Sequence, residues 1–321
     1  MTPKSIMGRP NLNRLAGPAV KPHSHAYQEV SAVVDRLERN QTLYAAENFI
    51  ERMKAIDVLE FQVLDDIGQV NDSRLSEAEK LRLRQRAEAL KQKLAGANER
   101  LYEHLLLSIR SNDRSAVKQC FRRAAQQISS RAEADSLGFD EFDMLVNGLL
   151  EVAFVPTEPE VREADVVDYQ PTPARIILKL VDELHATSED IFYDLGSGLG
   201  HVPILVNLLT GIKAKGVELE GTYFRYSTEC LEKLGLPDVE FINADARHLD
   251  YDEGTIFYMY TPFRGEMLRQ VLRKLEAQSE RRQIRVCTYG PCTLQVGGQD
   301  WLQPIFQTGQ QEGSLGIFGS L

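Results

Sequence analysis

The sequence predicts an α/β domain with a mostly parallel sheet, preceded by an all-α region. Three observations support this prediction. Apolar residues recur at helical spacing through much of residues 1–150, and short β-rich runs alternate with helical patterns in residues 151–321. The net charge also divides between the same two parts, with +1 in the first and −11 in the second. Such an asymmetry suggests two domains with different partners.

The overall composition is that of a globular protein with a substantial core. The chain has 321 residues, of which 43% are hydrophobic and 26% charged. A net charge of −10 excludes a uniformly basic coat for nucleic acid. No apolar run approaches the ~20 residues that span a bilayer, and no signal-peptide pattern follows the basic residues near the N-terminus. Because the four cysteines are scattered, we expect no disulfide framework and a cytoplasmic location.

Changes in composition predict the division of the chain. Prolines, glycines and asparagines dominate the first residues, and Pro156 and Pro159 stand among several acids further on. His23 and His25 have no further Cys or His nearby, so we expect no metal site. The predicted parts are a flexible tail over 1–26, a helical domain over 27–153, a linker over 154–168 and the α/β domain over 169–321.

The helical domain carries recognisable helix starts. Ser76 and Glu79 have the spacing of a capping box, while Asp113 and Asp140 are candidate N-caps. The predicted helical stretches are 27–67, 76–110, 113–128 and 140–152. This domain could dimerise or bind a partner.

A glycine-rich loop opens the α/β domain. A β-rich run from Ile191 contains Asp194 near its end, glycines follow at 196, 198 and 200, and a helical pattern begins at His201. Glycines allow a sharp turn and let a ligand approach the backbone, and the helix start offers free N–H groups to an anion such as a carboxylate. The spacing D-x-G-x-G-x-G matches neither the dinucleotide fingerprint G-x-G-x-x-G nor a Walker loop. The pattern therefore points away from NAD and ATP.

The later strands also end in polar residues. Glu218 ends the second strand, where an acid can accept hydrogen bonds from both ribose hydroxyls of a nucleoside. Asn243 and Asp245 stand at the end of the third. The predicted strands after the first are 214–218, 239–243, 255–260, 284–288, 302–307 and 314–319.

These motifs, in this order, resemble those of the class I S-adenosylmethionine (SAM) dependent methyltransferases. The resemblance covers residues 165–321 and implies a Rossmann-like seven-stranded sheet with a terminal antiparallel hairpin, and SAM as cofactor. It also implies that Asp245 meets the adenine amino group, and that Thr261-Pro262-Phe263 forms the acceptor-side motif.

A closer resemblance rests on Tyr169-Gln170-Pro171-Thr172-Pro173, Phe192-Tyr193-Asp194-Leu195-Gly196-Ser197-Gly198 and Gly216-Val217-Glu218. This series is similar to the non-SET lysine methyltransferases of the "disruptor of telomeric silencing" type. It implies a helical N-terminal domain and a loop in which Tyr169 and Thr172 fold over the methionine part of SAM. His201 would occupy the polar position after the last glycine. The cofactor-binding residues so implied are Tyr169, Thr172, Asp194, Gly196, Ser197, Gly198, Gly200, His201, Glu218, Asn243, Asp245 and Ala246.

The acceptor side leaves several functions open. Tyr258 and Tyr260 alternate onto one face and, with Thr261, are the catalytic candidates, which could orient the acceptor, take its proton or form a wall. This chain has Met259-Tyr260-Thr261 where that branch has Asn-Asn-Phe. The acceptor could be a protein, with lysine as one option, or a small molecule, and an RNA acceptor and a catalytically silent SAM-binding regulator or scaffold remain alternatives. Acidity disfavours naked nucleic acid.

Overall fold

The computed structural model describes residues 24–65, 76–129, 139–152, 167, 169–309 and 313–321. The chain forms two compact units, one of Met1–Leu105 with Cys120–Arg131 and one of Leu106–Gln119 with Ala132–Leu321. Most of the predicted tail and linker lies outside the described residues, so the domain limits stay predictions. No helix in the described ranges is long and apolar enough to cross a membrane.

The first unit is helical. Its elements are α1 (Ser24–Arg39), the 3-10 turns η1 (Gln41–Tyr44) and η2 (Ala46–Asn48), α2 (Phe49–Asp57), the π-helical η3 (Val58–Leu64), and parts of α4 (Glu77–Arg110) and α5 (Arg114–Ser129). The predicted pattern over 27–67 is interrupted at Asn40, whose side chain accepts the Thr42 N–H and starts η1. Asn and Asp favour such local side-chain-to-backbone bonds, which compete with a continuous helix. The capping box of Ser76 and Glu79 is confirmed by hydrogen bonds in both directions.

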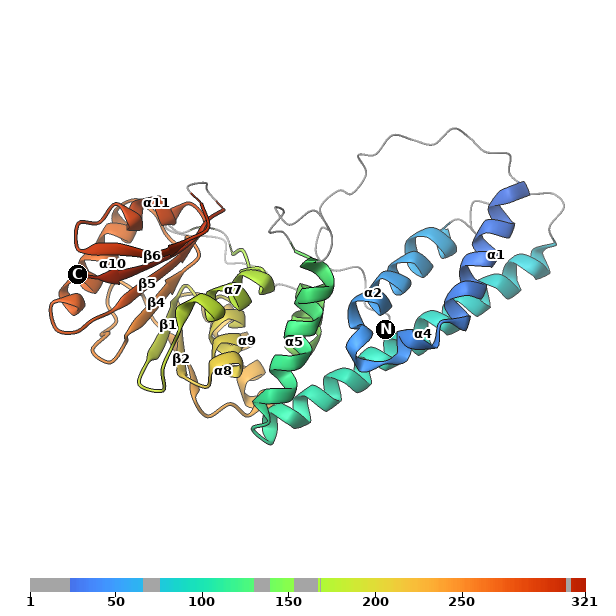
Figure 1. The fold of residues 1–321 in the computed structure, drawn as a ribbon, viewed down its shortest axis with the longest axis horizontal. Helices are drawn as coiled ribbons and strands as arrows, with labels where there is room; N and C mark the ends of the chain where they lie inside the picture. Colours follow the sequence, from blue (N-terminus) through green and yellow to red (C-terminus); the bar gives the residue numbers. More distant parts are fainter. Residues whose placement is uncertain (1–23, 66–75, 130–138, 153–166, 168, 310–312) are drawn as a thin grey trace. The chain divides into compact units, whose positions relative to one another are not determined.

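The second unit contains a seven-stranded sheet in the order β3-β2-β1-β4-β5-β7-β6 (Figure 1). The strands are β1 (Ile191–Leu195), β2 (Lys213–Glu218), β3 (Val239–Asn243), β4 (Ile256–Met259), β5 (Arg285–Tyr289), β6 (Leu302–Gln307) and β7 (Leu315–Ser320). Strand β7 runs antiparallel to both of its neighbours, and the other pairs are parallel. The predicted Rossmann-like sheet with its terminal hairpin is confirmed.

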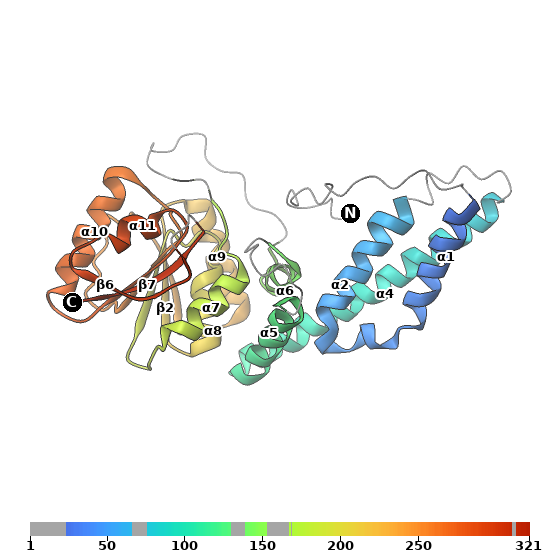
Figure 2. The ribbon, with the colours of Figure 1, turned by 45° about the horizontal axis from the view of Figure 1, so that its top comes forward.

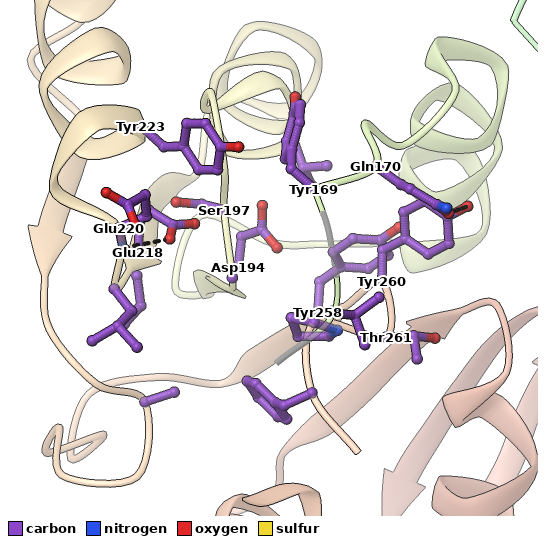
Figure 3. Close-up of a pocket in the computed structure, with 18 of the residues that line it drawn as sticks. Tyr169, Gln170, Asp194, Ser197, Glu218, Glu220, Tyr223, Tyr258, Tyr260 and Thr261 are labelled. Carbon is purple, nitrogen blue, oxygen red and sulfur yellow. Dashed lines mark hydrogen bonds between the residues drawn. The ribbon is translucent and has the colours of Figure 1, made fainter. Parts of the chain in front are cut away.

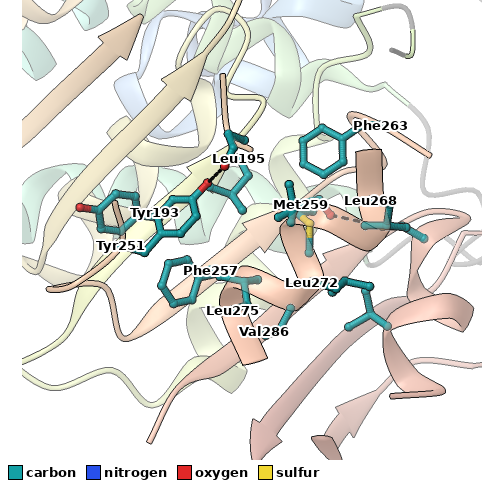
Figure 4. Close-up of a cluster of buried hydrophobic side chains, with 14 of the residues drawn as sticks. Tyr193, Leu195, Tyr251, Phe257, Met259, Phe263, Leu268, Leu272, Leu275 and Val286 are labelled. Carbon is teal, nitrogen blue, oxygen red and sulfur yellow. Dashed lines mark hydrogen bonds between the residues drawn. The ribbon is translucent and has the colours of Figure 1, made fainter. Parts of the chain in front are cut away.

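Helices cover both faces of this sheet (Figures 1 and 2). One face carries α7 (Ala174–Leu184), α8 (His201–Thr210) and α9 (Gly221–Leu234), and the other carries α10 (Gly265–Ser279) and α11 (Cys292–Gly297). Side chains alternate between the faces along each strand. Tyr193, Phe257 and Met259 therefore join the core under α10 (Figure 4), whereas Phe192 stacks on Tyr258 at the opposite face, with ring centroids 6.3 Å apart.

Helix α6 (Glu141–Leu149) also belongs to the second unit. Asp140 caps it as predicted, in a complete capping box, although the helix ends at Leu149 rather than near residue 152. The Asp143 carboxylate accepts the N–H of Ala174 at 2.7 Å, and the Tyr226 hydroxyl donates to the Glu151 carbonyl at 2.8 Å. These bonds tie α6 to the start of α7 and to α9.

Candidate functional site

A cavity of about 380 Å³, called the first cavity below, opens at the carboxyl ends of β1, β2 and β4 (Figure 3). Ligands of open α/β sheets bind at this edge because the loops after parallel strands converge there. The predicted residues that line it are Tyr169, Thr172, Asp194, Gly196, Ser197, His201, Glu218, Asp245, Ala246, Tyr258, Tyr260 and Thr261. Gly198, Gly200 and Asn243 are not among the lining residues.

The glycine loop has the backbone that the sequence predicted. Gly196 and Gly198 have φ angles of 88° and 53°, in the left-handed region that glycine adopts without strain. A Cβ on Gly196 would lie 2.3 Å from the Pro262 Cβ, and one on Gly198 would lie 2.1 Å from the Tyr169 ring. The absence of side chains at Gly196 and Gly198 thus lets Pro262, in the loop after β4, and the Tyr169 ring pack directly on the glycine loop.

Two buried carboxyl groups, those of Asp194 and Glu218, line the first cavity together. Glu218 accepts the backbone N–H groups of Gly198 and Glu220, both at 2.7 Å. Burial raises the pKa of Glu218, and burial together with the Glu218 charge raises the pKa of Asp194 well above its usual range. No lysine or arginine is among the described residues that line the cavity. This electrostatic environment favours a ligand that carries positive charge.

The end of β3 contributes differently from the end of β2. Asp245 pairs with Arg247 at 2.6 Å, and this hydrogen-bonded guanidinium lowers the pKa of the Asp245 carboxyl. Asn243 donates to the carbonyls of Glu218 and Leu219 at 2.8 and 3.1 Å. The Asn243 side chain, which does not line the cavity, therefore fixes the backbone that carries Glu218.

Two residues of the cavity wall carry a buried polar atom without a hydrogen-bond partner among the described residues. His201 and Ser197 are each 6% exposed, and both line the first cavity. The His201 Nδ1 and the Ser197 Oγ are buried without a hydrogen-bond partner in the part of the chain that the structure describes. Buried polar atoms are almost always paired, so these two fit a polar ligand that supplies the missing partners. Burial lowers the pKa of His201 to about 4, which keeps the imidazole neutral.

Residue 167 and residues 169–172, called the clasp segment below, run antiparallel to the chain that leaves β4. Three hydrogen bonds hold them together: Val167 N–H to the Pro262 carbonyl (3.2 Å), the Tyr260 hydroxyl to Gln170 Oε1 (3.2 Å), and Thr172 Oγ1 with the Tyr258 hydroxyl (3.0 Å). The clasp segment thereby forms one wall of the first cavity (Figure 3).

The catalytic candidates differ in what their hydroxyls can do. Burial raises the pKa of both Tyr258 and Tyr260, so both phenols stay protonated at neutral pH. They can orient a group but are poor bases. The Thr261 hydroxyl donates to the Tyr289 carbonyl and accepts the Cys292 N–H, while its backbone has a φ of 40°. Thr261 therefore shapes the loop at the mouth.

Three polar lining residues are absent from the predicted set: Gln170, Glu220 and Tyr223. The Tyr223 ring, on α9, lies 5.1 Å from the Tyr169 ring at an angle of 46°. Glu220 caps the same helix by accepting the Thr222 N–H. Only the position of Gln170 between Tyr169 and Thr172 could have indicated one of these residues from sequence.

The strand order, the glycine loop and the acidic cavity at its edge define a SAM-dependent methyltransferase of class I, with SAM as its cofactor. A family model described as "Histone methylation protein DOT1" matches residues 167–234, the stretch that runs from the clasp segment to the end of α9.

Similar proteins carry related descriptions. A protein-lysine N-methyltransferase from Saccharolobus islandicus (strain REY15A) is 29% identical over 111 residues, which cover 34% of this chain and 69% of that protein. An RNA methyltransferase from Salinibacter ruber, solved with S-adenosyl-L-homocysteine, has a TM-score of 0.40 and 19% identity over 47% of this chain and 94% of its own. A precorrin-6y C5,15-methyltransferase from Geobacter metallireducens has a TM-score of 0.38 and 14% identity, and the match covers 49% of this chain and 91% of that protein.

Proposed function

We propose that this protein transfers the methyl group of SAM to the side-chain amine of lysine in a protein acceptor. The observation that carries the proposal is a second cavity of about 350 Å³ beside the first. The two cavities share five lining residues: Val167, Gln170, Tyr260, Thr261 and Phe263. An acceptor in the second cavity is therefore separated from the cofactor only by the clasp segment and the loop after β4.

The first cavity holds the cofactor in this proposal. Glu218 accepts the ribose hydroxyls, and Asp245 meets the adenine amino group. Tyr169 and Thr172 cover the methionine part. The positive charge that SAM carries at its sulfonium and ammonium groups offsets the two buried acids, Asp194 and Glu218, which have no lysine or arginine beside them among the described lining residues.

The chemistry of the second cavity suits a lysine side chain. Tyr260, Tyr289 and Phe263 line it, and the first two rings lie 4.7 Å apart. Aromatic faces attract alkylammonium groups, and the aliphatic part of lysine packs well on such surfaces. Arg264 also lines the second cavity. Its positive charge and the apolar surroundings both lower the pKa of an entering amine, which favours the neutral form that attacks.

The reaction needs alignment more than acid or base chemistry. Bound SAM supplies a methyl group already activated by the sulfonium. As the amine lone pair forms the new N–C bond, the S–C bond breaks and its electron pair stays on sulfur. Tyr258 and Tyr260, protonated and anchored on the clasp segment, orient the reacting groups and exclude water. No Asp or Glu is among the described residues that line the second cavity, so the amine loses its proton to solvent before it attacks.

Two of the comparisons support a protein acceptor: the matched model described as a histone methylation protein and the relative described as a protein-lysine N-methyltransferase. The description of the second names lysine. The proposal stops at lysine within a protein and names no histone, because the chain has Met259-Tyr260-Thr261 at the acceptor side, where the lysine methyltransferases that it resembles carry Asn-Asn-Phe.

The test uses tritium-labelled SAM and two random peptide libraries, one containing lysine and one with arginine in its place. Acid hydrolysis of the labelled peptides should yield methylated lysine from the first library and no label from the second. Glu218→Gln should lose the label, whereas Glu240→Gln, an exposed acid on β3, should retain it. Label on another amino acid, or on RNA offered in parallel, would refute the lysine assignment. SAM binding without label in any acceptor would favour the silent SAM-binding alternative.

A further inference from the structure

Helix α6 supports the wall of the first cavity through a side chain that lies 54 residues from His201 in sequence. Asn147 lies on α6, and its Oδ1 is 2.8 Å from the Nε2 of His201, the first residue of α8. The same imidazole lines the first cavity, and its other nitrogen, Nδ1, is buried without a partner among the described residues. Asn147 thus holds one ring nitrogen while the other is left for a ligand.

This contact decides what the free nitrogen can bind. In a neutral imidazole one nitrogen donates a hydrogen bond and the other accepts one. An amide oxygen only accepts, so a neutral imidazole that bonds to the Asn147 Oδ1 carries its proton on Nε2 and keeps a lone pair on Nδ1. Such a lone pair repels a carboxylate and takes a hydrogen-bond donor.

SAM has three kinds of donor: the adenine amino group, the ribose hydroxyls and the α-ammonium. In the proposed cofactor site Asp245 and Glu218 take the first two. His201 directly follows the glycine loop, and the Tyr169 ring of the clasp segment lies against Gly198 of the same loop. In the proposed cofactor site, Tyr169 covers the methionine part. Asp194 adds a buried carboxyl to the same wall. The donor that remains for this region is the α-ammonium.

We propose that Asn147 is a positioning residue for the cofactor, which holds His201 in the tautomer whose Nδ1 accepts a hydrogen bond from the α-ammonium of SAM. The inference rests on the proposed cofactor site. Helix α6, which the sequence predicts to be part of the helical domain, would thus take part in cofactor recognition.

Helix α6 is fixed in place by several contacts, as a positioning role requires. Asp140 caps the helix and pairs with Arg175 at 2.5 Å, and Asp143 accepts the Ala174 N–H, two residues after Thr172. The helix that carries Asn147 is therefore tied to the start of α7, two residues beyond the end of the clasp segment. Positioning groups act by such fixed support, because a small displacement of a binding group loses much of its hydrogen-bond energy.

Nitrogen NMR of the ligand-free, ¹⁵N-histidine-labelled protein reads the tautomer directly. The chain has six histidines, and the His201 signals are assigned by their absence in His201→Asn. We expect the proton on Nε2 in the wild type and a mixture of tautomers in Asn147→Ala. A proton on Nδ1 in the wild type would overturn the proposal.

Calorimetry tests the ligand group. Loss of a hydrogen bond to a charged group predicts that Asn147→Ala weakens S-adenosylhomocysteine binding about 10- to 100-fold. Binding of 5′-methylthioadenosine, which lacks the amino-acid part, and of deaminated S-adenosylhomocysteine should change less than about twofold. An equal loss for all three ligands, or no loss for any, would refute the positioning role.

Two further variants separate positioning from folding. Asn147→Asp keeps an oxygen on the Nε2 proton and should bind S-adenosylhomocysteine within about threefold of the wild type, although Asn147→Ala does not. His201→Asn places an amide near the position of Nδ1, and Asn147→Ala should cost nothing further in that background. Failure of the wild type to bind S-adenosylhomocysteine would instead contradict the cofactor site itself.

Discussion

Glu218→Gln is the sharpest test of the cofactor site, because it changes one oxygen to nitrogen at nearly constant shape. The Glu218 carboxylate is 8% exposed and accepts two backbone N–H groups at 2.7 Å, from Gly198 and Glu220. A glutamine has only one acceptor oxygen. Its amide nitrogen must therefore face a backbone N–H or a ribose hydroxyl.

The magnitude follows from these contacts. A hydrogen bond to a charged group contributes about 1.5–3 kcal/mol, and a buried donor left unpaired costs about as much again. Burial raises the pKa of Glu218, so removal of the charge recovers part of a desolvation cost. We expect a net loss of about 2–3 kcal/mol in S-adenosylhomocysteine binding, which is about 30- to 150-fold in Kd.

Titration calorimetry with S-adenosylhomocysteine measures this loss, and circular dichroism checks that the variant folds. The matched control is Glu240→Gln on β3, an exposed acid that pairs with Lys215 at 3.0 Å. The control should bind as the wild type does. Unchanged affinity in Glu218→Gln, or an equal loss in the control, would refute the assignment of Glu218 to the ribose.

Three further predictions follow from the described contacts. Gly198→Ala should displace the Tyr169 ring, which a Cβ would meet at 2.1 Å, and weaken S-adenosylhomocysteine binding at least about tenfold by calorimetry; retained affinity would contradict the closed loop. Tyr260→Phe removes the bond to Gln170 and should lower the methyl-transfer rate about tenfold while binding of the cofactor product is unchanged. Weaker binding of the cofactor product with an unchanged rate of methyl transfer would contradict this role. Burial raises the pKa of Asp143 from 3.8 to about 7, so the folded state binds more protons than the unfolded state between these values, and the free energy of unfolding should fall by about 4 kcal/mol as pH rises through that range. Urea unfolding at pH 5 and pH 8 should show about 2.5 kcal/mol of this fall, and a fall of equal size in Asp143→Asn would exclude Asp143 as its source.

The strands were predictable because their signals are local. Each is a short apolar run bounded by a turn or a polar residue, and every predicted strand after the first agrees with the structure to within one residue at either end. The glycine loop was equally visible, since its φ angles need glycine and the required spacing lies within seven residues. The interruption at Asn40 was missed, because apolar spacing on both sides of a break looks the same as one continuous helix.

Part of the site was predictable for a topological reason. Asp194 and Glu218 end neighbouring parallel strands, and the carboxyl ends of parallel strands meet at one edge, so their meeting follows from the strand order. The same reasoning placed Asn243 and Asp245 together at the end of the third strand and did not separate their positions. In the structure Asn243 supports the β2 backbone, whereas Asp245 lines the first cavity.

The sequence by itself determined the α/β architecture and the acids at the strand ends, because periodicity and glycine requirement are properties of short segments. The class of cofactor followed from the resemblance of these motifs, in their order, to the class I methyltransferases. Only the tertiary structure decided that the clasp segment bonds to the exit of β4, 86 to 90 residues away, and that Asn147 reaches His201 across 54 residues. Such contacts depend on how helices and loops pack together, and packing leaves no periodic trace in the chain.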